Sequence, residues 1–418
     1  MIQTLKNAWK TPELRGKILF TILILLLYRL GANIPVPFID ADMMATFGDN
    51  MGGLFEYMNL LSGQAFSQGT LFALNVSPYI TASIVVQLLT IALPPLERWA
   101  KEGEAGKKKL NALTRYTTVG LALITAIGYT SLLNAGGYLT TSGKTAFGWI
   151  VIIACFCAGS SVIMWLAEKI NEHGIGNGIS MILFANIISS LPATLNTLFG
   201  MTWWVALLVV VAMAALVLFI VFINDAERRI PIQYAKRVVG RKVYGGQNTN
   251  LPIKVSMSGV LPVIFAGSIC SLPATVATFM GKTSGWWYEN LWSSTSAVYC
   301  VMYGLMIFFF SWFYSTIQYD PVEIANNLKK NGGFIPGFRP GKPTADFIKK
   351  VISKIVVFGA VYLAIVALLP IVAGNLVAGV KNLSIGGTSV IIVVGVALET
   401  VKAMEAQMLM RHYKGFLD

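Results

Sequence analysis

The sequence predicts an all-α membrane protein with ten transmembrane helices. Its 418 residues are 55% hydrophobic and 12% charged, and the mean hydropathy is +0.66. A soluble globule of this size needs more polar side chains to cover its surface. The apolar residues are gathered into ten runs, and the basic residues lie almost entirely in every second segment between those runs. These observations together predict a polytopic membrane protein.

Each of the ten runs is close to the ~20 residues that a helix needs to cross a bilayer. The first run is long enough to span, and no small-residue cleavage site follows it, so we expect a membrane helix rather than a cleaved signal peptide. The predicted spans are 18–34, 71–93, 112–133, 148–167, 179–198, 203–223, 256–280, 298–317, 352–372 and 388–405.

The distribution of basic residues predicts the orientation. If the N-terminus is cytoplasmic, the inner segments hold 28 of the 32 Lys and Arg residues, and the outer segments hold three, Lys144, Lys282 and Lys381. The reverse orientation would contradict the positive-inside rule. We therefore expect both termini in the cytoplasm, and the net charge of +13 mostly reflects this topology.

Ten spans divide into two sets of five, which we place at 1–200 and 201–418. An odd number of spans in each half makes the second half enter the membrane from the opposite side, so a duplication would give an inverted repeat. The sequence retains a faint trace of one, because the second and seventh spans share a P-x-I-x-A pattern that begins at Pro78 and at Pro262.

The predicted spans carry few groups that could do chemistry. Apart from four charged residues within four positions of a cytoplasmic end, Arg115, Lys354, Lys402 and Glu405, their only charges are Arg29 and Glu399. An ion-coupled carrier usually keeps a carboxylate near mid-membrane. Both histidines fall outside the spans, and the four cysteines form no CxxC pair. The sequence thus predicts no catalysis, no cofactor and no metal. A secondary solute transporter of inverted-repeat type remains the alternative, with a membrane enzyme third.

Residues 54–66 lie between two predicted spans and are apolar at every third or fourth position, yet they are too short to cross a bilayer. A short helix at membrane depth is tolerated only where it is buried in protein or lines a water-filled cavity. The next span carries several polar residues, among them Asn75, Thr81 and Gln87. This pattern indicates a re-entrant segment beside a helix that borders a cavity.

Six motifs stand out along the chain: TLFALNVSPYITASIVVQLL (70–89), HGIGNGIS (173–180), YAKRVVGRKVYGGQ (234–247), NNLKK (326–330), GFIPGFRPG (333–341) and GGTS (386–389). They resemble the bacterial SecY family, the channel subunit of the protein-export translocon. The resemblance follows the order of that family from about residue 12 to residue 413. Two positions depart from its pattern, since Asn75 stands where the family commonly has glycine and Gln64 interrupts a usual Gly-Gly.

The resemblance implies an hourglass-shaped pore between the two halves, a plug helix at 54–66 and a lateral gate formed by the second and seventh spans. A ring of aliphatic side chains would close the waist of the pore. The implied ring residues are Val76, Ile80, Ile179, Leu183, Ile264 and Ile392; the plug residues are Leu54, Phe55, Tyr57, Met58, Leu60 and Leu61; the gate residues are Thr81, Gln87 and Ser256.

Two long segments, 225–256 and 318–354, are expected to be cytoplasmic loops that bind partners. Each exceeds the usual length of a connection, and the Pro-Gly pairs around Arg339 would hold that residue in a defined turn. The resemblance implies that Arg241, Lys242 and Arg339 contact the motor ATPase SecA or, in competition, the phosphates of ribosomal RNA. It also implies SecE-like and SecG-like small membrane subunits, signal peptides and unfolded preproteins as partners, in a lipid bilayer that is the bacterial cytoplasmic membrane.

Overall fold

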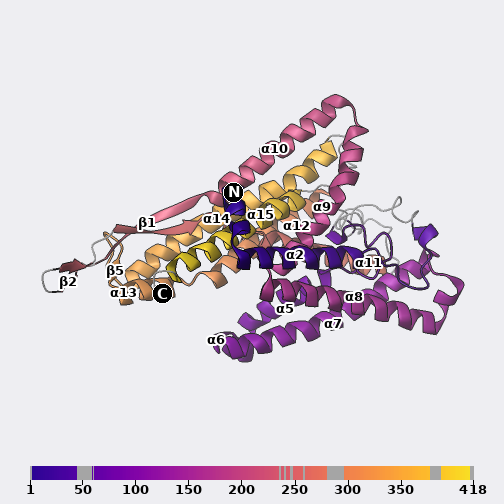
Figure 1. Ribbon diagram of the computed structural model, residues 1–418, viewed down its shortest axis with the longest axis horizontal. Helices are drawn as coiled ribbons and strands as arrows, with labels where there is room; N and C mark the ends of the chain where they lie inside the picture. Colours follow the sequence, from indigo (N-terminus) through magenta and orange to yellow (C-terminus); the bar gives the residue numbers. More distant parts are fainter. Residues whose placement is uncertain are drawn as a thin grey trace.

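A computed structural model describes residues 2–44, 59, 61–234, 237–239, 242–244, 248–257, 259–279, 296–376 and 387–414. Figure 1 shows an elongated bundle of helices with a narrow sheet that extends from one end. The connections α7–α8 and α9–α10 lie at the opposite end of the view from that sheet.

The first group of helices comes from the N-terminal part of the chain. Pro12 begins α2, and Pro94 begins α6 directly after the helix that precedes it, at positions where a proline's missing N–H removes no helical hydrogen bond. The group contains α1 (Ile2–Lys10), α2 (Pro12–Gly31), α5 (Ser77–Ala92), α6 (Pro94–Lys101), α7 (Glu104–Ala135), the short 3-10 helix η1 (Thr141–Lys144), α8 (Ala146–His173) and α9 (Gly178–Phe199).

The second group follows a short connection after Phe199. Asp320 caps its short helix α13 by accepting a hydrogen bond from the Val322 backbone N–H at 2.8 Å. The group contains α10 (Trp203–Asp225), α11 (Leu261–Phe279), α12 (Ala297–Gln318), α13 (Pro321–Lys330), α14 (Lys342–Leu376) and α15 (Gly387–Lys414).

All ten predicted spans coincide with helices, namely α2, α5, α7, α8, α9, α10, α11, α12, α14 and α15. By length and composition alone, six helices among the described residues can cross a membrane, and the pair α5 and α6, bent by 101°, would make a seventh. The others are shorter or more polar: α5 has 16 residues, and α15 carries Glu399, Lys402 and Glu405. Short or polar spans are typical of helices that face other protein rather than lipid.

The two segments expected to be loops contain regular structure. Strand β1 (Glu227–Tyr234) pairs antiparallel with β4 (Asn248–Lys254) and with β5 (Gly333–Phe334), so the two segments form one sheet in the order β4-β1-β5. A second hairpin joins β2 (Arg237–Val239) to β3 (Lys242–Tyr244). Ile230 and Ile232 of β1 pack with α13 and α14 residues in a separate hydrophobic cluster. The sheet is therefore attached to the helical body by its own small core.

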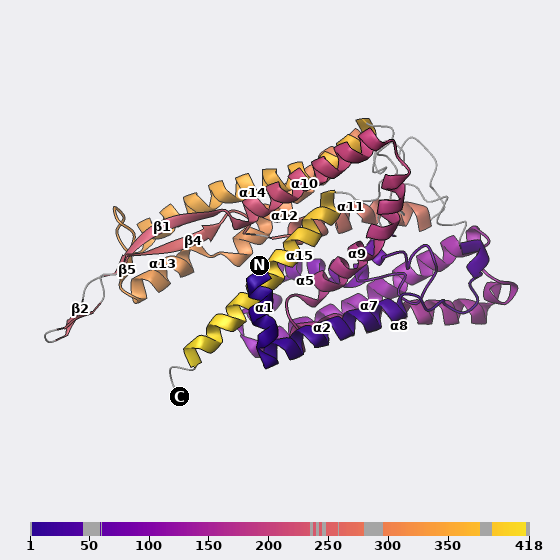
Figure 2. The same ribbon diagram turned by 45° about the horizontal axis from the view of Figure 1, so that its top comes forward.

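The two groups of helices meet along two seams, and Figure 2 shows α2, α7 and α8 of the first group below α10, α12 and α14 of the second. In the α11 seam, α11 packs against α5 and α7. In the α15 seam, α15 packs against α1 and α9 and is hydrogen-bonded to α2 by Lys17 Nζ, which donates to Gln407 Oε1 at 3.1 Å. The largest hydrophobic cluster contains residues of both groups and lies between them.

Candidate functional site

The six predicted ring residues meet in the cluster between the two groups of helices. Four helices or their ends supply them: α5 and α9 from the first group, and α11 and α15 from the second. Five are buried and one is partly buried against the others. The buried members are Val76, Ile80, Leu183, Ile264 and Ile392, and the partly buried member is Ile179.

Helical spacing explains why these side chains converge. Val76 and Ile80 are four residues apart, as are Ile179 and Leu183, so each pair lies on one face of its helix. On the opposite side, α15 approaches Val260, the residue before α11, closely because residue 395 is glycine. A Cβ at Gly395 would stand 2.2 Å from Cγ2 of Val260. The hydrophobic cluster between the two groups, called the aliphatic cluster below, thus receives a short apolar face from α5 and another from α9.

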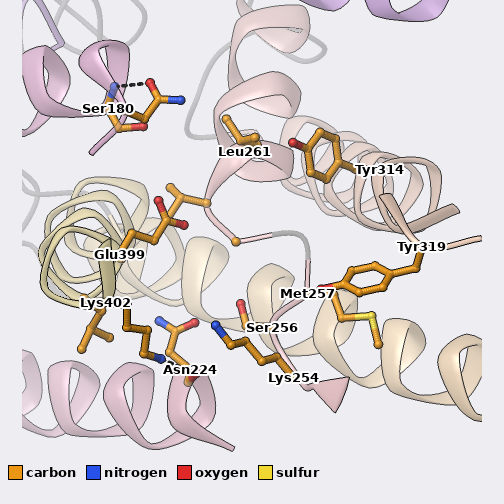
Figure 3. Close-up of a pocket in the computed structure, with 15 residues that line it drawn as sticks. Ser180, Asn224, Lys254, Ser256, Met257, Leu261, Tyr314, Tyr319, Glu399 and Lys402 are labelled. Carbon is orange, nitrogen blue, oxygen red and sulfur yellow. Dashed lines mark hydrogen bonds between the residues drawn. The ribbon is translucent and has the colours of Figure 1, made fainter. Parts of the chain in front are cut away.

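A polar pocket of about 290 Å³ opens beside this aliphatic cluster. Val260 and Leu261 belong to both the pocket and the cluster. Figure 3 shows Glu399 and Lys402 projecting into it from one helix, with Lys254 and the predicted gate residue Ser256 beside them. Lys402 is also paired with Asp225, with Nζ and Oδ1 at 2.8 Å. The aliphatic cluster therefore adjoins a space that charged side chains line.

Two of the three predicted gate residues, Thr81 and Gln87, lie on α5, and the third, Ser256, lines the polar pocket. Thr81 is half-buried on α5, and its hydroxyl donates to the Ser77 carbonyl of its own helix at 3.1 Å. Gln87 is half-buried two turns further along α5. Among the described residues, no hydrogen bond or ion pair joins α5 or α7 to α11. The α11 seam is held by apolar packing in the part of the chain described.

Comparison with known proteins identifies the family. The SecY family model matches residues 70–401. The protein translocase subunit SecY of Streptomyces galbus is 43% identical over 438 aligned positions, which cover 100% of each chain. The chain belongs to the SecY family.

Solved structures of a SecY protein and of Sec61 share the fold of this chain. A SecY protein whose plug domain stabilises the closed state of its translocation channel has a TM-score of 0.67 at 19% identity, and the match covers 94% of this chain and 92% of that one. Sec61 in the canine ribosome-channel complex has a TM-score of 0.64 at 18% identity, with the same coverage. The ten-helix SecY fold predicted from the sequence is confirmed.

Most of the predicted SecY plug lies outside the described residues. This applies to Leu54, Phe55, Tyr57, Met58 and Leu60. Leu61 is described, is partly buried against the aliphatic cluster, and lies at the start of a compact series of turns that leads to α5. The end of the predicted plug therefore contacts the cluster that contains the predicted ring.

Two of the three predicted partner-binding residues, Lys242 and Arg339, are among the described residues. Arg241 falls outside the described residues, and Lys242 belongs to β3, of which only the backbone is described. Arg339 is exposed in a fixed turn. Its carbonyl accepts a hydrogen bond from Thr344 Oγ1 at 2.8 Å, and the neighbouring Phe338 ring lies 4.3 Å from that of Phe347. The turn presents the guanidinium to solvent on a defined backbone.

The sequence analysis missed a buried polar network at the end of the predicted plug. Asn186 of α9 and Asn75 before α5 are 0% and 3% exposed, and both donate to the carbonyl of Leu61. Asn186 is an amide in an otherwise apolar span, which is a signal that could have found it, because buried polar groups in membrane helices need partners.

Proposed function

We propose that this protein is the channel subunit of a bacterial protein translocase, which moves unfolded secretory polypeptides across the cytoplasmic membrane. The observation that carries the proposal is the hydrophobic cluster that lies between the two groups of helices and contains all six ring residues, in a chain that matches SecY relatives over its full length. An apolar cluster between two groups of helices can seal a membrane at rest, and its side chains can move apart to admit a substrate.

The six ring residues would form the seal. A narrow apolar constriction excludes water and ions by dewetting, and flexible aliphatic side chains can close around an extended chain of any sequence. The polar pocket beside Val260 and Leu261 would belong to the hydrated funnel on one side of this constriction. Residues 1–200 and 201–418 would then be the two halves of an hourglass, related as inverted repeats.

The α11 seam would be the lateral gate, with Thr81, Gln87 and Ser256 near it. Lipid tails are as apolar as the packed side chains, so apolar contacts there give helices little drive to stay together. A signal sequence could replace them at low cost. Insertion energetics of about −0.3 to −0.6 kcal/mol per Leu, Ile, Phe or Val, against about +2.5 to +3.5 per charged residue, would decide whether a segment leaves through this gate.

The sheet and its turns would bind partners on the cytoplasmic side, where both termini would also lie. Arg241, Lys242 and Arg339 would meet acidic groups of a SecA-like motor or phosphates of ribosomal RNA, and the two partners would compete because they use the same cations. The second partner is supported by the likeness to Sec61, which was solved in a ribosome-channel complex. SecE-like and SecG-like subunits would complete the membrane assembly.

The test is reconstitution of the purified protein with its small subunits, motor and ATP in vesicles, followed by protease protection of a secretory precursor. We expect the precursor to become protected only when its signal sequence is intact. Vesicles that accumulate a small solute along an ion gradient, without protecting any precursor, would favour the solute-carrier alternative.

A further inference from the structure

The polar pocket continues three of the helix faces that carry the predicted ring. Three of its lining residues lie one helical turn from a ring residue on the same helix, and each step leads toward the helix end that the predicted orientation places in the cytoplasm. The pairs are Ser180 and Leu183 on α9, Leu261 and Ile264 on α11, and Gly395 and Ile392 on α15. A polypeptide that enters the ring from the cytoplasm would therefore pass this pocket first.

Glu399 presents a carboxylate to this pocket. It follows the ring residue Ile392 by two helical turns on α15. A Cβ at Gly259 would stand 2.8 Å from Oε1 of Glu399, so the carboxylate lies against the backbone just before α11. Within the part of the chain that the structure describes, Glu399 makes no side-chain hydrogen bond and no ion pair. Its negative charge is therefore available to a ligand beside the start of the α11 seam.

The two lysines of the pocket do not neutralise this carboxylate. Lys402 Nζ lies 2.8 Å from Asp225 Oδ1 and donates to the Asn224 carbonyl at 3.4 Å, so its charge is balanced by the end of α10. Lys254, at the end of β4, lines the same pocket and forms no ion pair with Glu399 or with any other described residue. The pocket thus holds one negative and one positive charge that are separate and unpaired.

We propose that Glu399 binds a Lys or Arg side chain that precedes the apolar segment of a signal sequence, as that segment enters the α11 seam. This inference rests on the proposed function. Cationic residues flank membrane-inserting segments on the cytoplasmic side. An apolar segment at the level of the ring would place this flank at the pocket, beside the start of α11. Lys254 would repel the same side chain, so the two residues together would set the preference for the charge of the flank.

The chemistry of the pocket suits a cationic side chain. A carboxylate beside an apolar cluster is screened less by water than one on an open surface, so it attracts an opposite charge more strongly. Ser256 and Tyr314 line the same pocket, and their hydroxyls can accept further hydrogen bonds from an ammonium or a guanidinium group. An acidic flank would instead be repelled by Glu399 and attracted by Lys254. The two charges therefore act in opposite directions on the same substrate.

The measurement is the initial rate of protease protection in vesicles that contain the assembled complex. Two precursors are compared that differ only in the flank before the apolar segment, which carries lysines in one and glutamates in the other. We expect E399Q to slow the lysine-flanked precursor about fivefold without slowing the glutamate-flanked one, and E399K to reverse the preference. K254Q should shift the ratio of the two rates the opposite way, in favour of the lysine-flanked precursor.

E405Q is the matched control, because Glu405 is exposed on the same helix and does not line the pocket. It should keep the wild-type ratio of the two rates. Equal slowing of both precursors by E399Q would overturn the inference, since it would indicate a structural role. So would a wild-type ratio in E399Q, or a change in E405Q as large as that in E399Q, which would indicate the general surface charge. E399Q keeps the shape of the side chain, so it gives the ratio even if E399K does not assemble. Failure of the proposed function is distinguishable, because wild-type vesicles would then protect neither precursor.

Discussion

The α15 seam and the α11 seam join the same two groups of helices in different ways. Across the α15 seam, Thr400 Oγ1 lies 3.6 Å from Met181 Sδ, and Lys17 is hydrogen-bonded to Gln407. Ala8, Leu14, Ile175 and Met404 form a separate hydrophobic cluster there. Across the α11 seam, no hydrogen bond or ion pair joins described residues of α11 to α5 or α7.

This difference indicates which seam opens. Separation of the α15 seam would break the hydrogen bond between Lys17 and Gln407 and expose a hydrophobic cluster of its own. Apolar contacts within the membrane lose little when lipid or another apolar helix replaces them. The α15 seam should therefore act as the hinge and the α11 seam as the opening.

The largest effect is expected where the ring crosses the α11 seam. I80G combined with I264G removes two buried side chains of the same cluster, one from each group of helices, so the constriction should become wide enough to hold water. We expect the resting ion conductance of reconstituted vesicles to rise several-fold. Val85 and Val276 lie on the same helices but are 38% and 53% exposed, and V85G with V276G should leave the conductance unchanged. Equal conductance in the two double variants would show that Ile80 and Ile264 do not belong to the ring.

A large loss of stability without leakage is expected in the α15 seam. Leu14 is 4% exposed in the cluster of that seam, so L14A should lower the free energy of unfolding by about 2 to 5 kcal/mol. L14M should cost less than about 1.5 kcal/mol, because it conserves volume. Thermal melting in detergent measures the stability, and planar-bilayer recording measures the leak. Leakage from L14A at temperatures where it stays folded would mean that this seam also seals the channel.

A smaller effect on rate is expected far from both seams. Arg339 is exposed on its turn and touches neither seam, so R339E should slow motor-driven export about tenfold, or ~1.4 kcal/mol, by opposing an acidic partner. R339K keeps the charge and should retain most of the rate. The resting conductance should match wild type in both. Export by R339E at the wild-type rate would argue against a docking role for Arg339. Loss of the R339E protein from the membrane would instead indicate a structural role for Arg339.

The smallest effect is expected for a single polar tie of the α15 seam. K17M removes the hydrogen bond to Gln407, which is only partly buried, so the free energy of unfolding should fall by about 1 kcal/mol. Q407L should produce the same loss, and the double variant should produce no more than either. Melting temperatures of the four proteins give this cycle. Additive losses would show that the two side chains do not stabilise each other.

Hydropathy predicted the position of every spanning helix but not its ends. The helix α14 begins at Lys342, ten residues before its predicted span, and α7 begins at Glu104 rather than 112. Hydropathy detects the apolar part of a helix, and these helices continue beyond it with polar residues. In the other direction, α5 begins at Ser77 rather than 71, because Asn75 takes a left-handed conformation that interrupts the helix.

Local signals for the sheet and for α13 were present in the sequence. Asp320 followed by Pro321 is a typical start of a helix, and Ile230 and Ile232 alternate with polar residues as in a half-buried strand. Their pairing could not be predicted. It joins β1 to a two-residue strand about 100 positions later in the chain, and only packing in three dimensions brings those residues together.

Some residues of the candidate site could be predicted from the sequence, and others could not. The ring residues were found through the resemblance, because an aliphatic side chain in an apolar span looks like any other. The network at Leu61 was missed since its acceptors are backbone carbonyls, which no residue type reveals. Its donors were visible as polar residues in apolar spans. Their acceptors, the carbonyls of Leu61 and Gly63, come within reach of them only when α2, α5 and α9 are assembled.

Two matched disulfides test the central claim most directly. In a background without Cys155, Cys157, Cys270 and Cys300, one variant links T81C to a cysteine placed within 264–272, across the α11 seam, at a position whose Cα lies within about 7 Å. The other links M181C to T400C across the α15 seam. The measurement is protease protection of a secretory precursor in vesicles, before and after reduction.

We predict that the oxidised α11 link stops translocation, that reduction or a longer flexible cross-linker restores it, and that the oxidised α15 link translocates at the unlinked rate. Translocation at the unlinked rate by the variant with a fully oxidised α11 link would contradict the account. So would an oxidised α15 link that blocks translocation as strongly as the α11 link.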